Sequence, residues 1–301
     1  MSTTGRTNLE RELLTQADDW AAVVARVPAL QPVLPHAGER VAVVGCGTSY
    51  HMGLAYAERR EAGGQGVTDA FPASEHHLDR GYDRVVLISR SGTTSEVMAV
   101  QAELITRGVA TTTLVATAGT ALTRGGGDVV LLSEVDESSV VQTRFATTAL
   151  TLLRAGLGED LAAAIADVRA VLDEPAETAV GHLAGVEQLT FLGRGWCVGL
   201  AMEAALKLRE SAQLWTESYP AMEYRHGPIS IAAPGRAVWA FGEVPEGLAA
   251  EVEATGAVFE HRTIDPVAEL VRVHRLCVAA AGRRGLDPDV PRHLTRSIIL
   301  S

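Results

Sequence analysis

Residues 41–49 have the sequence Val-Ala-Val-Val-Gly-Cys-Gly-Thr-Ser, and this stretch decides the fold class. Val41–Val44 is a short run of small and β-branched apolar residues, which is typical of a strand buried on both faces. Gly45 and Gly47 follow, and the next segment, rich in Ala, Leu and Met, predicts a helix to about Arg60. A buried strand, a glycine turn and a helix are the elements of a parallel α/β sheet covered on both faces.

The same succession of strand, turn and helix recurs along the chain. Further strands are predicted at residues 85–88, 112–115, 129–132, 189–192, 238–241 and 275–280. A shift of 148 residues superimposes Gly45 on Gly193 and Gly47 on Gly195, each after an apolar strand and before a helix. We therefore predict a repeat of two similar α/β halves, joined at the acidic, Pro-containing stretch 172–175.

These patterns predict three segments. The apolar spacing of residues 9–27 predicts an amphipathic helix that ends at Pro28 and Pro32. This helix belongs to an N-terminal helical segment of residues 1–35. A first α/β domain is expected at 36–170, and a second, with a C-terminal tail, at 171–301.

Composition and charge exclude several classes of function. The 301 residues hold 26 Lys and Arg against 37 Asp and Glu, a net charge of −11. Nucleic acids and anionic membranes need a basic footprint, so neither is expected as a partner. Three cysteines without a CxxC pair indicate reduced thiols, and no apolar run reaches the ~18 residues of a membrane span. We expect a soluble cytoplasmic protein.

Hydroxyl groups gather at both strand–helix junctions of the first half. One junction carries Thr48 and Ser49, and the other carries Ser89, Ser91, Thr93 and Thr94. Loops at the carboxyl ends of parallel strands bind ligands, and backbone N–H groups with several hydroxyls can hold a phosphate there. The alternative is that these residues cap helices, since Thr93 and Glu96 have the spacing of a capping box.

Other ligand and catalytic motifs are absent from the sequence. The third glycine of a dinucleotide-binding G-x-G-x-x-G falls at Tyr50 in the first half and Val198 in the second. There is no P-loop, no G-x-S-x-G nucleophile elbow, and no HExxH or spaced Cys/His set, so no metal or cofactor is expected.

The second half carries titratable groups on a helix predicted at residues 198–214. Glu203, Lys207 and Glu210 share one face of it. From the spacing alone this face is interpreted as solvated, with a Glu–Lys pair worth about 0.3–0.5 kcal/mol. His226 lies in a polar segment beside a Gly-Pro turn, where it is either an ordinary loop residue or a proton-transfer group.

Four motifs carry a resemblance to a known family. They are residues 45–50 (Gly-Cys-Gly-Thr-Ser-Tyr), 88–94 (Ile-Ser-Arg-Ser-Gly-Thr-Thr), 204–210 (Ala-Ala-Leu-Lys-Leu-Arg-Glu) and 225–228 (Arg-His-Gly-Pro). In this order and spacing the chain after residue 35 resembles the SIS (sugar isomerase) family. It is most similar to the isomerase half of glucosamine-6-phosphate synthase and to stand-alone phosphosugar isomerases and amino-sugar-phosphate deaminases. The resemblance implies two flavodoxin-like subdomains, a homodimer with sites shared between subunits, and binding of a phosphorylated sugar without a cofactor.

The resemblance also implies roles for single residues. Ser49, Ser89, Ser91 and Thr94 would hold the phosphate, with Thr48 and Arg90 in the sugar pocket. Glu210 matches the carboxylate that moves a proton between carbons 1 and 2, Lys207 the lysine one turn before it, and His226 the ring-opening histidine from the neighbouring subunit. This implication replaces the solvated-face interpretation of Glu210.

Two departures from the family pattern bear on the reaction. The chain has no room for a glutaminase domain before residue 35, so we expect no glutamine-fed synthase. In the tail at residues 291–297 the synthase has a lysine where this chain has Arg296. Arginine stays protonated and forms no Schiff base, although it can bind a sugar oxygen.

We therefore predict an aldose–ketose isomerase that acts on a sugar 6-phosphate, with an amino sugar favoured, by enediol proton transfer. The alternatives are an amino-sugar-6-phosphate deaminase, a deglycase of phosphorylated Amadori compounds, and a non-catalytic sugar-phosphate sensor. A sensor needs only the phosphate-binding residues, so the presence of Glu210, Lys207 and His226 together favours catalysis.

Overall fold

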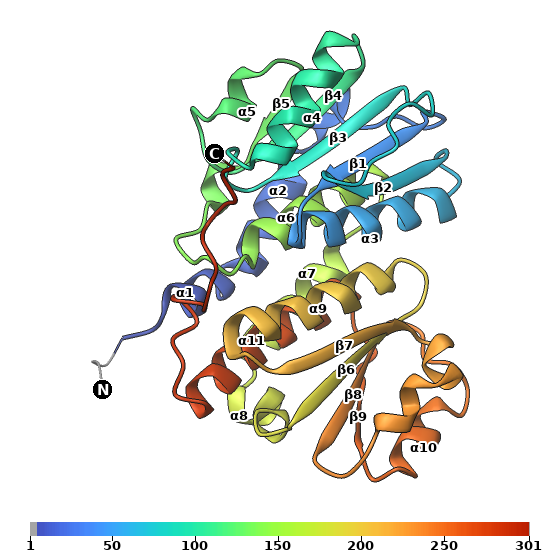
Figure 1. The fold of residues 1–301 in the computed structure, drawn as a ribbon, viewed down its shortest axis with the longest axis vertical. Coiled ribbons are helices and arrows are strands. Elements are labelled where there is room, and N and C mark those ends of the chain that lie inside the picture. The colour runs from blue at the N-terminus through green and yellow to red at the C-terminus, as the bar shows by residue number, and fades with distance from the viewer. Residues whose placement is uncertain (1–4, 301) are drawn as a thin grey trace. The chain divides into compact units, whose positions relative to one another are not determined.

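The chain forms two compact units, each built on its own parallel sheet, in a computed structural model that describes residues 5–300 (Figure 1). Unit 1 combines the chain up to Ala17 with Glu137–Thr143 and Ala162–Leu294. Unit 2 combines Asp18–Asp136, Arg144–Leu161 and the chain from Thr295. Both units are therefore discontinuous in sequence, and residues 172–175, predicted as the linker, lie inside unit 1.

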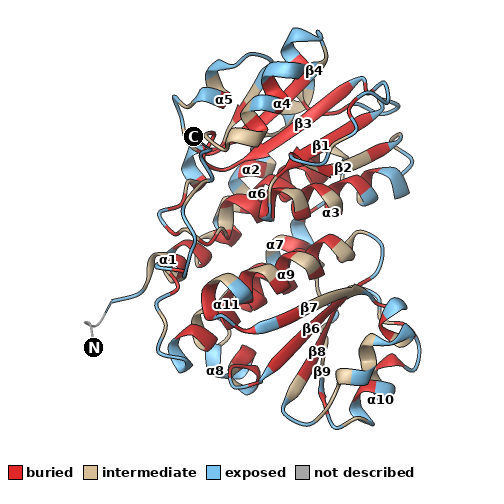
Figure 2. Ribbon diagram, in the orientation of Figure 1, coloured by how far each residue is buried: buried red, intermediate tan, exposed pale blue. Residues whose placement is uncertain are grey.

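Unit 2 holds a five-stranded sheet in the order β2-β1-β3-β4-β5, with all strands parallel. Its strands are β1 (Val41–Gly45), β2 (Thr68–Pro72), β3 (Arg84–Ser89), β4 (Ala110–Val115) and β5 (Asp128–Leu131). Its helices are α3 (Thr48–Ala62), α4 (Ser95–Thr106), α5 (Ala121–Arg124) and α6 (Arg144–Gly156), together with most of α2 (Gln16–Leu30) and the 3-10 turns Gln31–Val33 and Ser133–Val135. Every residue of β1 and β3 is buried, because helices cover both faces of the sheet (Figure 2).

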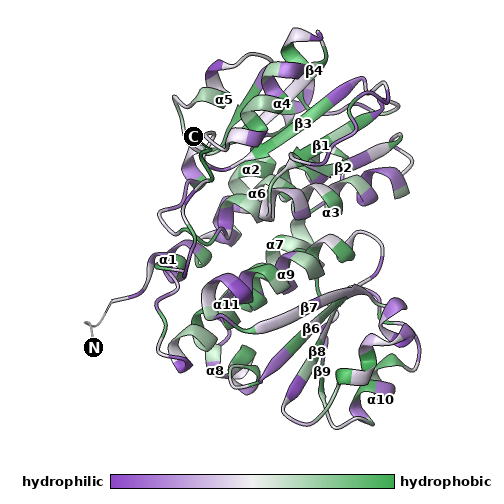
Figure 3. Cartoon of the chain, in the orientation of Figure 1, coloured by the Kyte–Doolittle hydropathy of each residue, from purple (hydrophilic) through white to green (hydrophobic). Residues whose placement is uncertain are grey.

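Unit 1 holds a four-stranded parallel sheet in the order β7-β6-β8-β9. Its strands are β6 (Gln188–Gly193), β7 (Trp215–Pro220), β8 (Arg236–Phe241) and β9 (Val258–Glu260). Its helices are α1 (Asn8–Leu13), α7 (Ala162–Asp173), α8 (Ala176–Val180), α9 (Cys197–Ala212), α10 (Leu248–Glu253) and α11 (Pro266–Arg283), with 3-10 turns at Gly181–Leu183, Glu223–His226 and Pro228–Ile231. The apolar residues of β6 and β8 lie at the centre of this unit (Figure 3).

The predicted fold class, two flavodoxin-like α/β subdomains that each contain a parallel sheet flanked by helices, is confirmed. The sheet of unit 2 starts with β1, and β2 pairs with it on one side. The chain then crosses over, so that β3 pairs with β1 on the other side. The loops that follow β1 and β3 consequently leave the same edge of the sheet side by side, at the point where ligands bind in open α/β sheets.

The glycines of the two strand–helix turns have the same local roles in both units. A Cβ on Gly45 would lie 2.7 Å from Ser49 Cβ, and one on Gly193 would overlap the carbonyl of Cys197. Each strand therefore ends in close contact with the first turn of its helix. Gly47 and Gly195 have φ angles of +52° and +54°, a conformation that side chains rarely allow.

The prediction of a strand at residues 275–280 is wrong, because this segment is the middle of helix α11. Asp265 caps the helix by accepting the Val267 N–H, and Pro266 occupies the first helical position, where a proline is favourable. Residues 276–280 form a short apolar run, and periodicity alone does not distinguish such a run in a buried helix from a buried strand.

The N-terminal prediction is also corrected in detail. Residues 9–27 form two helices, α1 and α2, separated by a turn at Leu14 and Thr15. Pro28 does not end the second helix but lies in its last turn, where a missing N–H costs a single intrahelical hydrogen bond. Strands β2, β7 and β9 were not predicted. Among residues 5–300, no helix is both long enough and apolar enough to cross a lipid bilayer.

Candidate active site

The two hydroxyl-rich loops of unit 2 do not use their hydroxyls as helix caps. Helix α3 has Gly47 at its N-cap position, and helix α4 has Thr94 there without a side-chain capping bond. The capping box predicted from Thr93 and Glu96 is therefore wrong. The hydroxyls belong to buried residues at the sheet edge, namely Thr48, Ser49, Ser89 and Ser91, and to the half-buried Thr94.

The loop after β3 is held in shape by its own serines. Ser89 Oγ accepts a hydrogen bond from the Gly92 N–H at 3.3 Å, and Ser91 Oγ accepts one from the Thr93 N–H, also at 3.3 Å. Gly92 has a φ of +64°, and a Cβ there would collide with the Thr120 hydroxyl. The loop thus has a fixed path at the N-terminus of α4, where helix N–H groups and the helix dipole favour an anion.

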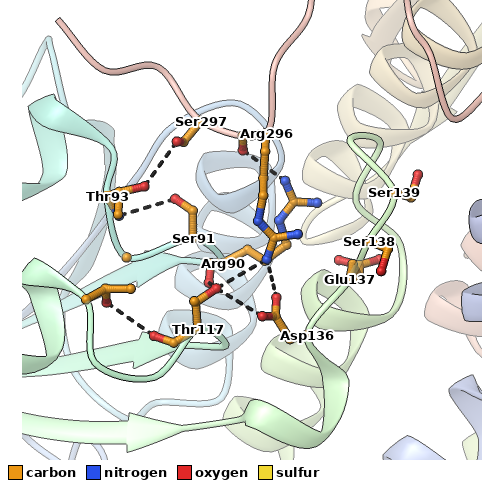
Figure 4. Close-up of polar contacts among 12 residues, drawn as sticks. Arg90, Ser91, Thr93, Thr117, Asp136, Glu137, Ser138, Ser139, Arg296 and Ser297 are labelled. Atoms are coloured by element: carbon orange, nitrogen blue, oxygen red, sulfur yellow. Dashed lines mark hydrogen bonds and ion pairs between the residues drawn. The ribbon is translucent and has the colours of Figure 1, made fainter.

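The C-terminal tail is fastened to this loop (Figure 4). The Arg296 guanidinium forms an ion pair with Asp136 and donates to Thr117 Oγ1 at 3.2 Å. Arg90, which is buried, donates to the Arg296 carbonyl oxygen at 2.9 Å. The charge of Arg296 is therefore balanced by a carboxylate, and its guanidinium is held by Asp136 and Thr117.

Further hydrogen bonds continue along the tail. The hydroxyls of Thr93 and Ser297 lie 3.0 Å apart, and the Ser95 N–H donates to the Ile298 carbonyl oxygen at 3.2 Å. The Leu300 N–H in turn donates to Ser95 Oγ at 2.9 Å. The tail therefore occupies the Thr93 hydroxyl and the first N–H of α4. Within residues 5–300, the hydroxyls of Ser91 and Thr94 form no hydrogen bond with the tail.

In unit 1, Lys207 lies between two carboxylates on helix α9. Its Nζ is 2.5 Å from Glu210 Oε2 and 3.5 Å from Glu203 Oε1. Lys207 and Glu203 are each about 1 % exposed, whereas the Glu210 side chain is 18 % exposed. The solvated-face interpretation of this helix is therefore wrong for Glu203 and Lys207, and Glu210 forms the accessible end of a buried charged cluster.

The carboxylates determine the charge of Lys207. Burial alone lowers the pKa of an ammonium group, but the two neighbouring carboxylates outweigh this effect and raise the pKa of Lys207 above its ordinary value. On the side of helix α11 the cluster faces His274 and Cys277. Burial lowers the pKa of His274 to about 3 and raises the pKa of Cys277 to about 12, so both groups are neutral near pH 7.

Glu210 opens into a cavity of about 640 Å³ within unit 1. The cavity is lined by Leu206, Arg209, Glu210, Gln213, Leu214, Trp215, Thr216, Glu217, Arg292, His293 and Leu294. Its volume lies in the range of small-molecule pockets. Trp215, on the edge strand β7, is 72 % exposed at its rim, so one wall of the cavity is open to solvent.

His226 lies apart from this cavity in unit 1. It ends the 3-10 turn Glu223–His226 and is exposed, and Gly227 follows with a φ of +128°. Its neighbour Arg225 is bound to Glu251 by two hydrogen bonds of 2.7 and 2.9 Å, which anchors the turn. His226 is not among the residues that line the cavity beside Glu210.

Sequence reasoning missed several residues of these sites. Asp136 and Thr117 bind the tail, and Gln16 and His274 lie behind the charged cluster. None of them belongs to a local motif, so no signal near them in the sequence marks their role.

A parallel sheet with hydroxyl-rich loops at its switch point defines the class of open α/β domains that bind their ligands at the edge of the sheet. Within that class the match is specific, because residues 34–155 match the SIS domain family. The resemblance drawn from the four motifs is confirmed.

Individual relatives support this assignment. In an alignment 318 positions long, the chain is 30 % identical to glutamine–fructose-6-phosphate aminotransferase (isomerizing) of Pyrobaculum aerophilum. The alignment covers 87 % of this chain and 52 % of that protein. The chain thus spans about half the length of this relative. Glucosamine-6-phosphate deaminase of Thermotoga maritima has the same fold, with a TM-score of 0.83, 22 % identity, and coverage of 98 % of this chain and 100 % of that one. Tagatose-6-phosphate ketose/aldose isomerase of Escherichia coli gives a TM-score of 0.79, 18 % identity, and coverage of 96 % and 98 %.

Proposed function

We propose that this protein is a phosphosugar isomerase that interconverts an aldose and a ketose 6-phosphate, with an amino sugar as the favoured substrate. The observation that carries the proposal is the Glu203–Lys207–Glu210 cluster, in which a buried ammonium 2.5 Å from Glu210 leaves that carboxylate facing a cavity. A carboxylate so placed is suited to act as a general base on a carbon next to a carbonyl group. The relatives named for phosphosugar isomerisation and deamination make this the favoured chemistry.

In the proposed mechanism Glu210 removes the proton from one of carbons 1 and 2 and returns it to the other. The negative charge that develops on the enediolate oxygen is stabilised by the Lys207 ammonium. His226 opens the sugar ring by moving a proton between the ring oxygen and a hydroxyl, for which an imidazole is suited near neutral pH.

The phosphate is held in unit 2 by Ser49, Ser89, Ser91 and Thr94 and the helix N–H groups, with Thr48 and Arg90 contacting the sugar. Because the chain carries a net charge of −11, these local dipoles must supply the attraction that the overall field opposes. Arg296 serves as the anchor of the tail through Asp136, which is consistent with an enediol route without an imine between enzyme and substrate.

The proposal includes a homodimer in which His226 of one subunit serves the site of the other. Its exposed side chain, which is not among those that line the cavity beside Glu210, supports this arrangement. Mixing His226→Ala and Glu210→Gln subunits under conditions of subunit exchange should restore part of the turnover, and no recovery would count against shared sites.

The direct test is to incubate the protein with glucosamine, galactosamine and fructose 6-phosphates and to measure ketose or aldose formation and ammonia release separately. We expect fructose 6-phosphate to be interconverted with its aldose without ammonia, whereas a 2-amino sugar can yield a ketose only if ammonia leaves carbon 2. Ammonia release from an amino sugar would favour the deaminase alternative, which uses the same proton transfer. Binding without either product would identify a sensor and refute the proposed function.

A second prediction concerns the phosphate loop. In the double variant Ser91→Ala and Thr94→Ala, the affinity for sugar 6-phosphates should fall about 10²-fold or more, because a hydrogen bond to a charged group is worth about 1.5–3 kcal/mol. Calorimetric titration measures the change. Thr106→Ala, on the exposed end of the same helix, is the matched control and should bind normally. Unchanged affinity in the double variant would show that these hydroxyls do not bind phosphate.

A further inference from the structure

Gln16 and His274 form a buried polar pair in unit 1, behind the charged cluster of helix α9. Gln16 is fully buried and begins helix α2, directly after the turn that separates it from α1. His274 lies on helix α11 and is 1 % exposed. Gln16 Nε2 and His274 Nδ1 are 3.3 Å apart, although the two residues are separated by 258 positions in sequence.

The contacts of Gln16 determine which nitrogen of His274 carries the proton. Gln16 Nε2 also lies 3.1 Å from the carbonyl oxygen of Leu13. A carbonyl oxygen only accepts hydrogen bonds, so the amide is oriented with its NH₂ group toward Leu13 and toward His274. His274 Nδ1 therefore accepts, and the ring is the neutral tautomer with its proton on Nε2.

The neutral ring of His274 lies close enough to the charged cluster of helix α9 for a charge on the ring to act on that cluster. Helix α11 packs along helix α9 (Figure 1), and the charges that act on His274 are those of Glu203 and Lys207. One turn further along α11, the thiol of Cys277 is hydrogen-bonded to Ser211. It also interacts electrostatically with Lys207, Glu203 and Glu210. The α11 side of the cluster therefore presents an imidazole and a thiol, neither of them charged near pH 7.

We propose that His274, fixed as the neutral Nε2–H tautomer by Gln16, is a positioning residue for Lys207 and Glu210. An imidazolium at this place would attract Glu203 and repel the ammonium of Lys207, because the burial that surrounds the cluster strengthens both interactions. A neutral imidazole instead leaves the Lys207 ammonium between its two carboxylates and so orients Glu210 toward the cavity. The inference rests on the proposed function, in which Glu210 is the general base.

Two substitutions of nearly equal size at Gln16 test the inference. In Gln16→Glu the new carboxylate accepts a hydrogen bond from His274 and favours the imidazolium. We expect kcat to fall about 10-fold or more, with KM for the sugar phosphate within about 3-fold of wild type. In Gln16→Met the hydrogen bond to His274 is lost but no charge is added, so kcat should fall less than in Gln16→Glu. Thermal unfolding of both variants shows how far each change affects the fold.

A spectroscopic measurement gives a readout that does not depend on turnover. In protein labelled with ¹⁵N-histidine, the His274 signals should be those of the Nε2–H tautomer and should not titrate between pH 8 and 5. In Gln16→Glu they should be those of a protonated ring. Titration of wild-type His274 near pH 6.5 would overturn the inference, as would equal losses of kcat in the two variants. Absence of turnover in the wild-type protein with every sugar phosphate would instead overturn the proposed function, and with it the positioning role.

Discussion

Replacing Glu210 by glutamine is expected to abolish the exchange of substrate hydrogen at carbons 1 and 2 with deuterated solvent. The amide keeps the size of the side chain and can still accept a hydrogen bond from Lys207, but it cannot take up the proton. General acid–base catalysis contributes about 10²–10⁴-fold, so turnover should fall by a factor in this range. The affinity for the sugar phosphate, measured by calorimetry, should stay within about 3-fold, because the proposed phosphate-binding residues belong to unit 2 and not to the Lys207 cluster.

Glu217 provides the matched control for this substitution. It lines the same cavity as Glu210, but it belongs to strand β7 and is hydrogen-bonded to the Tyr219 hydroxyl at 3.1 Å, with no part in the Lys207 cluster. Glu217→Gln removes the same charge from the cavity wall and should leave hydrogen exchange within about 3-fold of wild type. Equal exchange in the Glu210 and Glu217 variants would exclude Glu210 as the base.

The strands and turns that are marked by residues adjacent in sequence could be predicted from the sequence. Strand β1 and the turn after it were predicted because Val41–Val44 is uniformly apolar and Gly45 and Gly47 mark the turn within a few residues. Strand β9 was missed, since three residues carry no periodic signal. Helix α11 was mistaken for a strand around Arg275 because the five apolar residues that follow Arg275 are too few to show a helical period.

The candidate sites show the same limit. Helical spacing correctly placed Glu203, Lys207 and Glu210 on one face, but burial of that face is decided by its packing against α11, far along the chain. The pair of Asp136 and Arg296 joins residues 160 positions apart, and nothing near either residue indicates it. The chemical groups of a site can thus be found from local patterns, whereas their charge balance depends on long-range contacts.

Replacing Lys207 by methionine is expected to cost both stability and activity. The substitution leaves the fully buried Glu203 and the partly buried Glu210 without their shared cation. Removing one partner of a buried ion pair destabilises a protein by about 3–5 kcal/mol, and for a unit of this size each kcal/mol lowers Tm by about 2–4 °C. Turnover should be lost as well, since the ammonium proposed to stabilise the enediolate is gone.

The pH dependence of the stability lost in Lys207→Met identifies the cause of that loss. Without Lys207, burial raises the pKa of the Glu203 carboxyl, so the folded variant binds a proton that the unfolded chain releases above about pH 4.3. The variant therefore becomes more stable as the pH falls, and its Tm difference from wild type should be smaller at pH 5.5 than at pH 8. The double variant Lys207→Met with Glu203→Gln, which removes the uncompensated charge, should recover most of the stability at pH 8 and none of the turnover. A Lys207→Met protein that loses less than about 1 kcal/mol at pH 8, or whose deficit does not change with pH, would show that the cluster is not the buried charged network described above.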